Sequence, residues 1–239
     1  MIDKINVLKI EVSNASFHSA LEEVKKWLGD GVEKRYIVTP NPEILVAAQK
    51  DDDLQAILNQ ADLALPDGIG LLWASRVLGE PLKERIAGVD FMEKLCGLAA
   101  EGGFTVGLIG GGDDIAIKAA KCLKKKHPGL RVVLAQEEWE DNSSKLPIDI
   151  LFVALGAPKQ EIWMSTHLND LPVRVTMGVG GSFDYFAGTI PRAPKWMQDL
   201  GLEWLYRLIR QPWRLKRQLA LLKFIWLILK EKYGWQSRR

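Results

Sequence analysis

The residues best suited to chemistry lie in short polar clusters. Asp67 stands between Pro66 and Gly68, where an aspartate often does no more than stabilise a turn. It could instead take a proton from an attacking hydroxyl group, with Thr39 and Asn41 beside it if the two preceding segments are adjacent parallel strands. The residues alone leave both roles for Asp67 open.

Three consecutive glycines, Gly110–Gly112, would let the backbone approach a nucleotide diphosphate at the start of a following helix. The full dinucleotide fingerprint needs a further glycine where Ile115 stands, and Asp113–Asp114 would cap the helix while repelling an anion. Either Glu137 or Glu138 could accept hydrogen bonds from ribose hydroxyls. Nucleotide binding and a simple tight turn therefore remain alternatives, and the acids suit UDP and NAD equally.

We expect no bound metal and no other cofactor. Asp51–Asp53 matches the D-x-D pattern of metal-binding enzymes, but it opens a predicted helix, where acids complement the helix dipole. The two cysteines form no C-x-x-C pair, and the three histidines lack ligand spacing, so disulfides and zinc are not expected either.

The end of the chain is strongly basic. From residue 196 onward, ten lysines and arginines stand against three acids, a net charge of +7 in a chain whose total is +2. Four arginines recur at intervals of three or four and would share one helical face, with Pro212 tolerable at a kink or a new helix start; they are Arg207, Arg210, Arg214 and Arg217. The planar guanidinium group suits phosphates because it donates paired hydrogen bonds.

The apolar segment 219–230 follows these arginines. Lys223 interrupts it, and it is shorter than the roughly 20 apolar residues that a membrane span needs. It suits an interfacial helix on an anionic membrane surface, while a helix buried against the body or against a second copy is the alternative. Nucleic acid is not an expected partner, because groove-reading and base-stacking motifs are absent.

The elements that must position these residues predict an α/β fold. Short runs rich in Val, Ile and Leu alternate with helical periodicity, which indicates a doubly wound, mainly parallel sheet with helices on both faces. Expected strands cover 36–39, 63–66, 105–110, 131–135, 149–156 and 173–179, and expected helices lie near 16–28, 42–49, 51–60, 68–78, 90–101, 114–126, 158–168 and 194–210. We expect a catalytic body, 1–195, and a basic, amphipathic helical appendage, 196–239.

A polar or glycine-rich cluster follows each of the six predicted strands. In open parallel sheets, ligands bind beyond the carboxyl ends of the strands, so six clusters predict one large site at that edge. The composition, 47% hydrophobic and 26% charged, is that of a globular protein with a sizeable core. The first residues lack the pattern of a secretory signal, which predicts a cytoplasmic location.

Seven segments in order resemble the WecG/TagA/CpsF family of bacterial glycosyltransferases, over most of the chain. They are Thr39–Asn41, Leu65–Gly68, Glu84–Asp90, the Gly110 loop, Leu155–Glu161, Gly178–Asp184, and Pro191–Pro194 running into Gly201–Arg207. The stretch Gln136–Trp139 departs from the more glycine- and aromatic-rich loop of the family.

The resemblance implies an inverting, metal-independent transfer of N-acetylmannosamine from UDP to the 4-hydroxyl of N-acetylglucosamine on undecaprenyl diphosphate, at the inner face of the membrane. In the TagA branch this serves wall teichoic acid synthesis. Asp67 would be the base, with Thr39 and Asn41 lining the sugar site. Donor-binding residues would be Gly110, Gly111, Gly112, Glu137, Gln160, Glu161, Gly181 and Asp184. Acceptor-diphosphate residues would be Arg85, Arg207, Arg210, Arg214 and Arg217.

Other functions remain open at this stage. Within the family, the donor could be the uronic acid of UDP-N-acetylmannosamine or another UDP-hexose. A nicotinamide-dependent oxidoreductase would use the glycine run and the acids at 137–138, although its fingerprint is incomplete. A membrane-recruited nucleotide-binding module without catalysis is a third possibility, and assembly into a homo-oligomer is compatible with each.

Overall fold

The centre of the protein is a six-stranded parallel sheet in the order β4-β3-β8-β7-β5-β6. The computed structural model describes residues 2–30, 33–140, 147–212 and 215–234, with side chains omitted at 216–218. The sheet strands are β3 (Arg35–Val38), β4 (Leu63–Ala64), β5 (Thr105–Gly110), β6 (Arg131–Gln136), β7 (Ile148–Ala154) and β8 (Val173–Gly178). The α/β prediction is confirmed.

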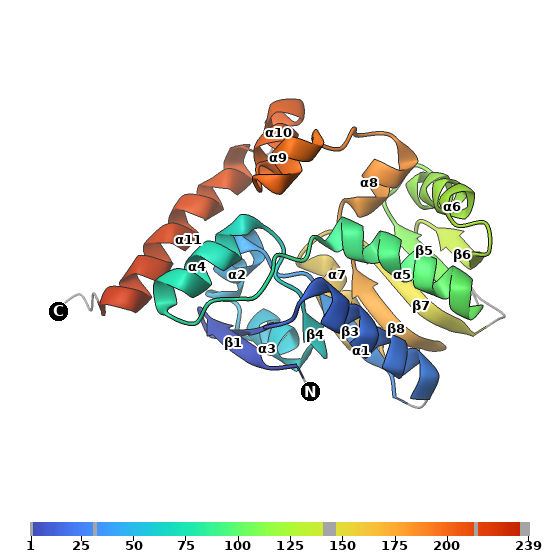
Figure 1. Cartoon of the computed structure of the whole chain (residues 1–239), viewed down its shortest axis with the longest axis horizontal. Coiled ribbons are helices and arrows are strands. Elements are labelled where there is room, and N and C mark those ends of the chain that lie inside the picture. The colour runs from blue at the N-terminus through green and yellow to red at the C-terminus, as the bar shows by residue number, and fades with distance from the viewer. Residues whose placement is uncertain (1, 31–32, 141–146, 213–214, 235–239) are drawn as a thin grey trace.

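Helices cover both faces of this sheet (Figure 1). Alternating side chains divide the core: in β7, Ile150 and Phe152 join the cluster under one layer, and Leu151 and Val153 join the other. The first layer holds α1 (Phe17–Asp30), α5 (Gly88–Gly102), α6 (Ile115–Lys126) and α8 (Ser182–Ala187). The second holds α2 (Pro42–Ala48), α3 (Asp52–Gln60), α4 (Ile69–Leu78), α7 (Lys159–His167) and α11 (Leu215–Tyr233).

Local signals explain where two of the helices begin. Asn41 caps α2 by accepting hydrogen bonds from the backbone N–H groups of Glu43 and Ile44, and Pro42 opens the helix. Asp51 caps α3 by accepting from the backbone of Leu54. Reading Asp51–Asp53 as a helix start is therefore confirmed.

Three parts of the architecture differ from the sequence predictions. An antiparallel hairpin of β1 (Lys4–Val7) and β2 (Ile10–Ser13) precedes the sheet, and α8 follows β8; neither was predicted. The single helix expected over 194–210 is two, α9 (Lys195–Asp199) and α10 (Glu203–Arg210), because Gly201 adopts a left-handed conformation between them.

The C-terminal helix α11 is amphipathic and packs against α2 and α4, as Figure 1 shows at the side of the molecule. Phe224 and Ile228 are fully buried in the second core cluster. The opposite face exposes apolar side chains at intervals of four and three, namely Leu215, Leu219, Leu222, Trp226, Leu229 and Tyr233. No helix among the described residues has both the length and the apolar character needed to cross a bilayer. The division at residue 195 stays a prediction.

Replacing Phe224 with Ala should lower the free energy of unfolding by about 3–5 kcal/mol, because it leaves a cavity between α11 and the body. Trp226→Ala, on the exposed face of the same helix, should change it by less than about 0.5 kcal/mol. Urea denaturation of both variants measures the difference. Equal effects would mean that α11 does not pack on the body through Phe224.

Candidate functional site

Two adjoining pockets lie at the carboxyl edge of the sheet. The aspartate pocket contains Asp67, Thr39 and Arg207 and has a volume of about 560 Å³. The glycine pocket contains Gly110–Gly112 and Glu137 and has a volume of about 410 Å³. Gly156, Gly180 and Gly181 line both. All six predicted clusters contribute to these two adjoining pockets.

Asp67 lies where the sequence predicts it, beside the segment that follows β3. Its backbone N–H donates to the carbonyl of Pro40 at 2.9 Å, which continues the parallel pairing of β3 and β4. Burial raises the pKa of Asp67 to about 6, and the negative charges of Glu203 and Asp90 add to this, while Arg85 and the N–H of Gly88 oppose it. A carboxylate with this pKa is a competent proton acceptor near neutral pH.

Thr39 and Asn41 line the same pocket but are partly committed to the fold. The hydroxyl of Thr39 donates to the carbonyl of Gly178 at 3.2 Å, which ties β3 to β8. Its oxygen can still accept a hydrogen bond from a ligand. The side-chain oxygen of Asn41 caps α2, so only its amide nitrogen is available as a donor.

Gln160 and Glu161 are buried at the start of α7 and brace the loop after β8. Gln160 Oε1 accepts from the N–H of Gly180 at 3.0 Å, and its Nε2 donates to Glu161 at 2.8 Å. The Oε2 atom of Glu161 has no hydrogen-bond partner among the described residues, and burial raises the pKa of this carboxyl. Both residues line the aspartate pocket, so any donor contact they make is in that cavity.

The glycine loop turns through five consecutive residues with positive φ, from Gly110 to Asp114. Glycine is required at the first of them because a Cβ on Gly110 would lie 2.6 Å from the backbone of Ala154. Asp114 stands at the N-cap of α6, but its side chain makes no capping hydrogen bond, contrary to the expectation for Asp113–Asp114. The three glycines thus line the glycine pocket with backbone atoms alone at the end of β5.

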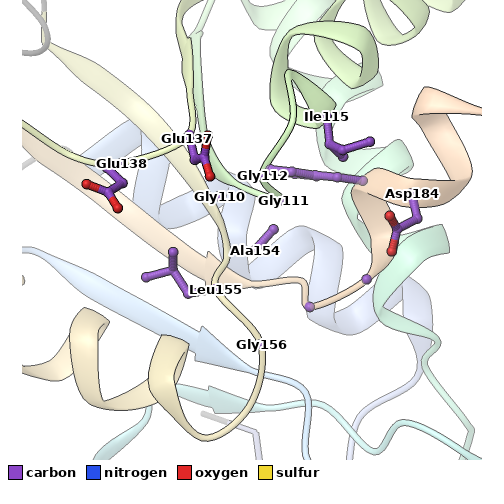
Figure 2. A pocket seen from close by; sticks show the side chains of 13 residues that line it. Gly110, Gly111, Gly112, Ile115, Glu137, Glu138, Ala154, Leu155, Gly156 and Asp184 are labelled. Atoms are coloured by element: carbon purple, nitrogen blue, oxygen red, sulfur yellow. The ribbon is translucent and has the colours of Figure 1, made fainter. Parts of the chain in front are cut away.

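Acidic side chains dominate the rim of the glycine pocket. Figure 2 shows Glu137 next to the glycine loop and Asp184 on the side of α8, with Glu138 farther along the chain. The residues that line this pocket include these three carboxylates and no lysine or arginine. Such a lining can accept hydrogen bonds from ribose hydroxyls or a base N–H, and it is a poor environment for a diphosphate.

Arg207 lies at the junction of the two pockets. Its guanidinium group covers Gly181 so closely that a Cβ on that glycine would come within 2.3 Å of Nη2. Asp184 accepts from Nη2 at 3.2 Å, and the ring of Tyr185 lies 5.3 Å from the guanidinium carbon. This positive charge beside a glycine loop is the best site for an anion among the described lining residues.

No single continuous helix carries Arg207, Arg210 and Arg217. α10 ends at Arg210 and α11 begins at Leu215, so the chain breaks where Pro212 allowed a new start. Arg210 is exposed, stacks near Tyr206 and does not line either pocket. Arg214 and the side chain of Arg217 lie outside the described residues.

Sequence reasoning missed Arg192 and Glu203, two charged residues that lie next to the predicted Arg85 at the aspartate pocket. Arg192 donates to both carboxylate oxygens of Asp90, at 2.5 and 2.7 Å, and its Nε donates to Glu203 at 2.9 Å. Arg85 contacts Glu203 at 3.9 Å and donates to the carbonyl of Gln198. The only available signal in the sequence was that these residues fall within three of the segments that resemble the family, 84–90, 191–194 and 201–207.

No group of three or more His, Cys, Asp or Glu side chains arranged for a metal ion occurs in the described part of the chain. The three carboxylates of the glycine pocket are spread around its rim.

Comparison with known proteins identifies the family. The sequence pattern of the "Glycosyl transferase WecG/TagA/CpsF family" matches residues 5–238. The chain belongs to this family. A Bacillus subtilis (strain 168) relative, N-acetylglucosaminyldiphosphoundecaprenol N-acetyl-beta-D-mannosaminyltransferase, is 35% identical over 92% of this chain and 88% of its own length. A Staphylococcus aureus (strain MRSA252) protein of the same name is 31% identical over 96% and 93%.

Membership of the WecG/TagA/CpsF family makes the chain a glycosyltransferase and confirms the resemblance read from its segments. Each of the seven segments contributes to the two pockets or to the charged mouth around Glu203. Glu203 and Arg207, both within residues 201–207 of this glycosyltransferase, line the aspartate pocket. The C-terminal segment therefore forms part of the wall of this pocket.

Proposed function

We propose that the enzyme transfers N-acetylmannosamine from UDP-N-acetylmannosamine to the 4-hydroxyl of N-acetylglucosamine on undecaprenyl diphosphate, with inversion, in wall teichoic acid or related surface polymer synthesis. The observation that carries the proposal is the Asp67 carboxylate, with its pKa raised to about 6, in a pocket connected to a second, acid-rimmed pocket. The activity named for the Bacillus and Staphylococcus relatives supports the sugar and the acceptor.

The donor extends across both pockets in this proposal. The uridine occupies the glycine pocket, where Glu137 accepts from its ribose hydroxyls. The diphosphate lies at the junction, on Arg207 and the backbone of Gly181. The sugar enters the aspartate pocket near Thr39 and Asn41, and Gln160 with Glu161 support the loop beneath it.

The reaction is a direct displacement at the anomeric carbon. Asp67 removes the proton of the acceptor hydroxyl as its oxygen attacks, and a new glycosidic bond forms. The bond between the anomeric carbon and the phosphate oxygen breaks, and UDP leaves with the electron pair. Arg207 stabilises the negative charge that develops on the departing diphosphate. In this proposal Asp67 supplies the base and Arg207 the counter-charge.

The acceptor approaches from the side of α10 and α11. Arg85, at the mouth of the aspartate pocket, and Arg210, Arg214 and Arg217 supply positive charge for its diphosphate in this proposal. The exposed apolar face of α11, with its flanking lysines and arginines, suits the anionic inner surface of the cell membrane, where the lipid tail is held. The same apolar face could also contact a second copy in a homo-oligomer.

Incubation with a panel of UDP-sugars and a soluble N-acetylglucosamine-diphospho-lipid should give product fastest from UDP-N-acetylmannosamine, including in excess EDTA. Metal is not needed because backbone N–H groups and arginines meet the phosphate charge. Faster transfer from the uronic acid donor would change the assigned sugar. Activity that EDTA abolishes and Mg²⁺ restores would contradict the metal-independent mechanism, and NADH binding without transfer would overturn the function.

A further inference from the structure

Five charged residues from four segments form a cluster at the aspartate pocket: Asp67, Arg85 and Glu203 line the pocket, and Asp90 and Arg192 lie next to Glu203. Glu203 is central, because one carboxylate oxygen accepts from Arg192 Nε at 2.9 Å and the other lies 3.9 Å from Arg85. Its side chain is only 17% exposed. The cluster contains three carboxylates and two guanidinium groups, so it has one negative charge in excess when all are ionised.

Both arginines in this cluster are engaged away from Asp67. Arg192 uses two N–H groups on Asp90 and a third on Glu203. Arg85 is held by Glu203 and by the carbonyl of Gln198. Among the described residues, Asp67 forms no salt bridge with either. A carboxylate paired directly with arginine is a weaker base, so this arrangement keeps Asp67 basic.

We propose that Glu203 is a positioning residue for the transfer reaction: it holds Arg85 and Arg192 away from Asp67, and its own negative charge increases the basicity of that carboxylate. The inference rests on the proposed role of Asp67 as the base. Glu203 need not contact the donor or acceptor, since it acts through the two arginines and through its charge.

The electrostatics around Asp67 agree with this geometry. Burial is the main cause that raises its pKa to about 6, and the charge of Glu203 is the next; Asp90 acts in the same direction more weakly. Arg85 and the N–H of Gly88 lower it. Removing the charge of Glu203 therefore lowers the pKa of Asp67 and also frees Arg85 to approach it, and both effects have the same sign.

The position of Glu203 in the chain gives the arrangement a further property. Glu203 opens α10, and Arg207 lies one turn later on the same helix. Seating α10 against the body therefore brings the residue that tunes the base together with the arginine at the pocket junction. The bidentate contact between Arg192 and Asp90 fixes the preceding loop to the start of α5, which holds α10 in this place.

The test is the pH dependence of kcat for the wild type and Glu203→Gln, with a soluble acceptor and saturating UDP-N-acetylmannosamine. The glutamine oxygen can still accept from Arg192, so the charge changes more than the shape. The wild-type rate should fall below a pH near 6 as Asp67 becomes protonated. In Glu203→Gln this acid limb should move to lower pH by about half a unit or more.

Two further variants make the result specific. Asp199→Asn removes one charge from the neighbouring helix, where Asp199 is exposed and pairs with Lys195 at 3.0 Å, and should leave the acid limb unchanged. Glu203→Asp retains the charge and should stay close to the wild-type limb. If Glu203→Gln does not fold, Asp90→Asn should give a smaller shift in the same direction.

A reduced rate with the acid limb unmoved in Glu203→Gln would show that Glu203 serves only to pack α10, and would overturn the inference while leaving the proposed function intact. Absence of transfer by the wild type from any UDP-sugar would instead overturn the proposed function itself.

Discussion

Replacing Asp67 with Asn should reduce transfer by about 10²- to 10⁴-fold, the usual contribution of a positioned general base. The substitution keeps the shape of the side chain and removes its ability to take the acceptor proton. The affinity for UDP should change little, because Asp67 lies in the aspartate pocket and the nucleotide is assigned to the glycine pocket. Initial rates on a soluble acceptor and calorimetric titration with UDP measure the two effects.

The same variant should fold at least as well as the wild type. Folding raises the pKa of Asp67 above its ordinary value of 3.8 to about 6, so its ionisation opposes folding as the pH rises through that value. Asparagine remains neutral and avoids this cost. Thermal unfolding at pH 8 is therefore the control, and a folded variant with near wild-type turnover would return Asp67 to the role of a turn residue.

Replacing Arg207 with Gln should lower transfer by about 10²-fold or more, because a single group that stabilises developing charge commonly contributes that much. UDP binding should also weaken, since Arg207 is assigned to the donor diphosphate at Gly181. Arg210→Gln, one turn away and exposed, should have a much smaller effect on UDP affinity. Titration with UDP and transfer assays on both variants separate the two arginines.

Gly181→Ala offers an independent check of the same assignment. The backbone at Gly181, with φ −82° and ψ 22°, accepts an alanine, but the added Cβ would come within 2.3 Å of Arg207 Nη2. The guanidinium group must therefore move off the junction. Loss of transfer in Gly181→Ala similar to that in Arg207→Gln is expected, whereas wild-type rates in both variants would remove Arg207 from the donor site.

The convergence of Asp67 with Thr39 was predictable from the sequence because parallel strands bring their carboxyl ends to one edge. The pairing of Leu65 with Val38, and of Asp67 with Pro40, follows from that rule once two neighbouring strands are assigned. The glycine loop and the loop after β8 met for the same reason. The rule for parallel strands does not predict that the site consists of two adjoining pockets. That arrangement depends on the positions of Gly156 and Gly181, which line both pockets.

Contacts between distant segments escaped sequence reasoning. Arg192 reaches Asp90 across 102 positions, and a charged side chain carries no local pattern that names its partner. The prediction of one helix over 194–210 is wrong because the periodicity of the apolar residues continues past Gly201. The left-handed backbone conformation of Gly201 separates α9 from α10. The spacing of the arginines indicates one face only while the helix is continuous, and α10 ends at Arg210 before α11 begins at Leu215.

The order of the strands determines when the sheet can close during synthesis. β3 pairs early with β4, and β5 with β6, but these two units are joined only through β7 and β8, from residues 148–178. β8 pairs with β3, whose partner residues lie 140 positions earlier in the chain, and such non-local pairing is slow to form. Until β8 leaves the ribosome, one edge of β3 and one edge of β7 stay unpaired and open to association with other chains.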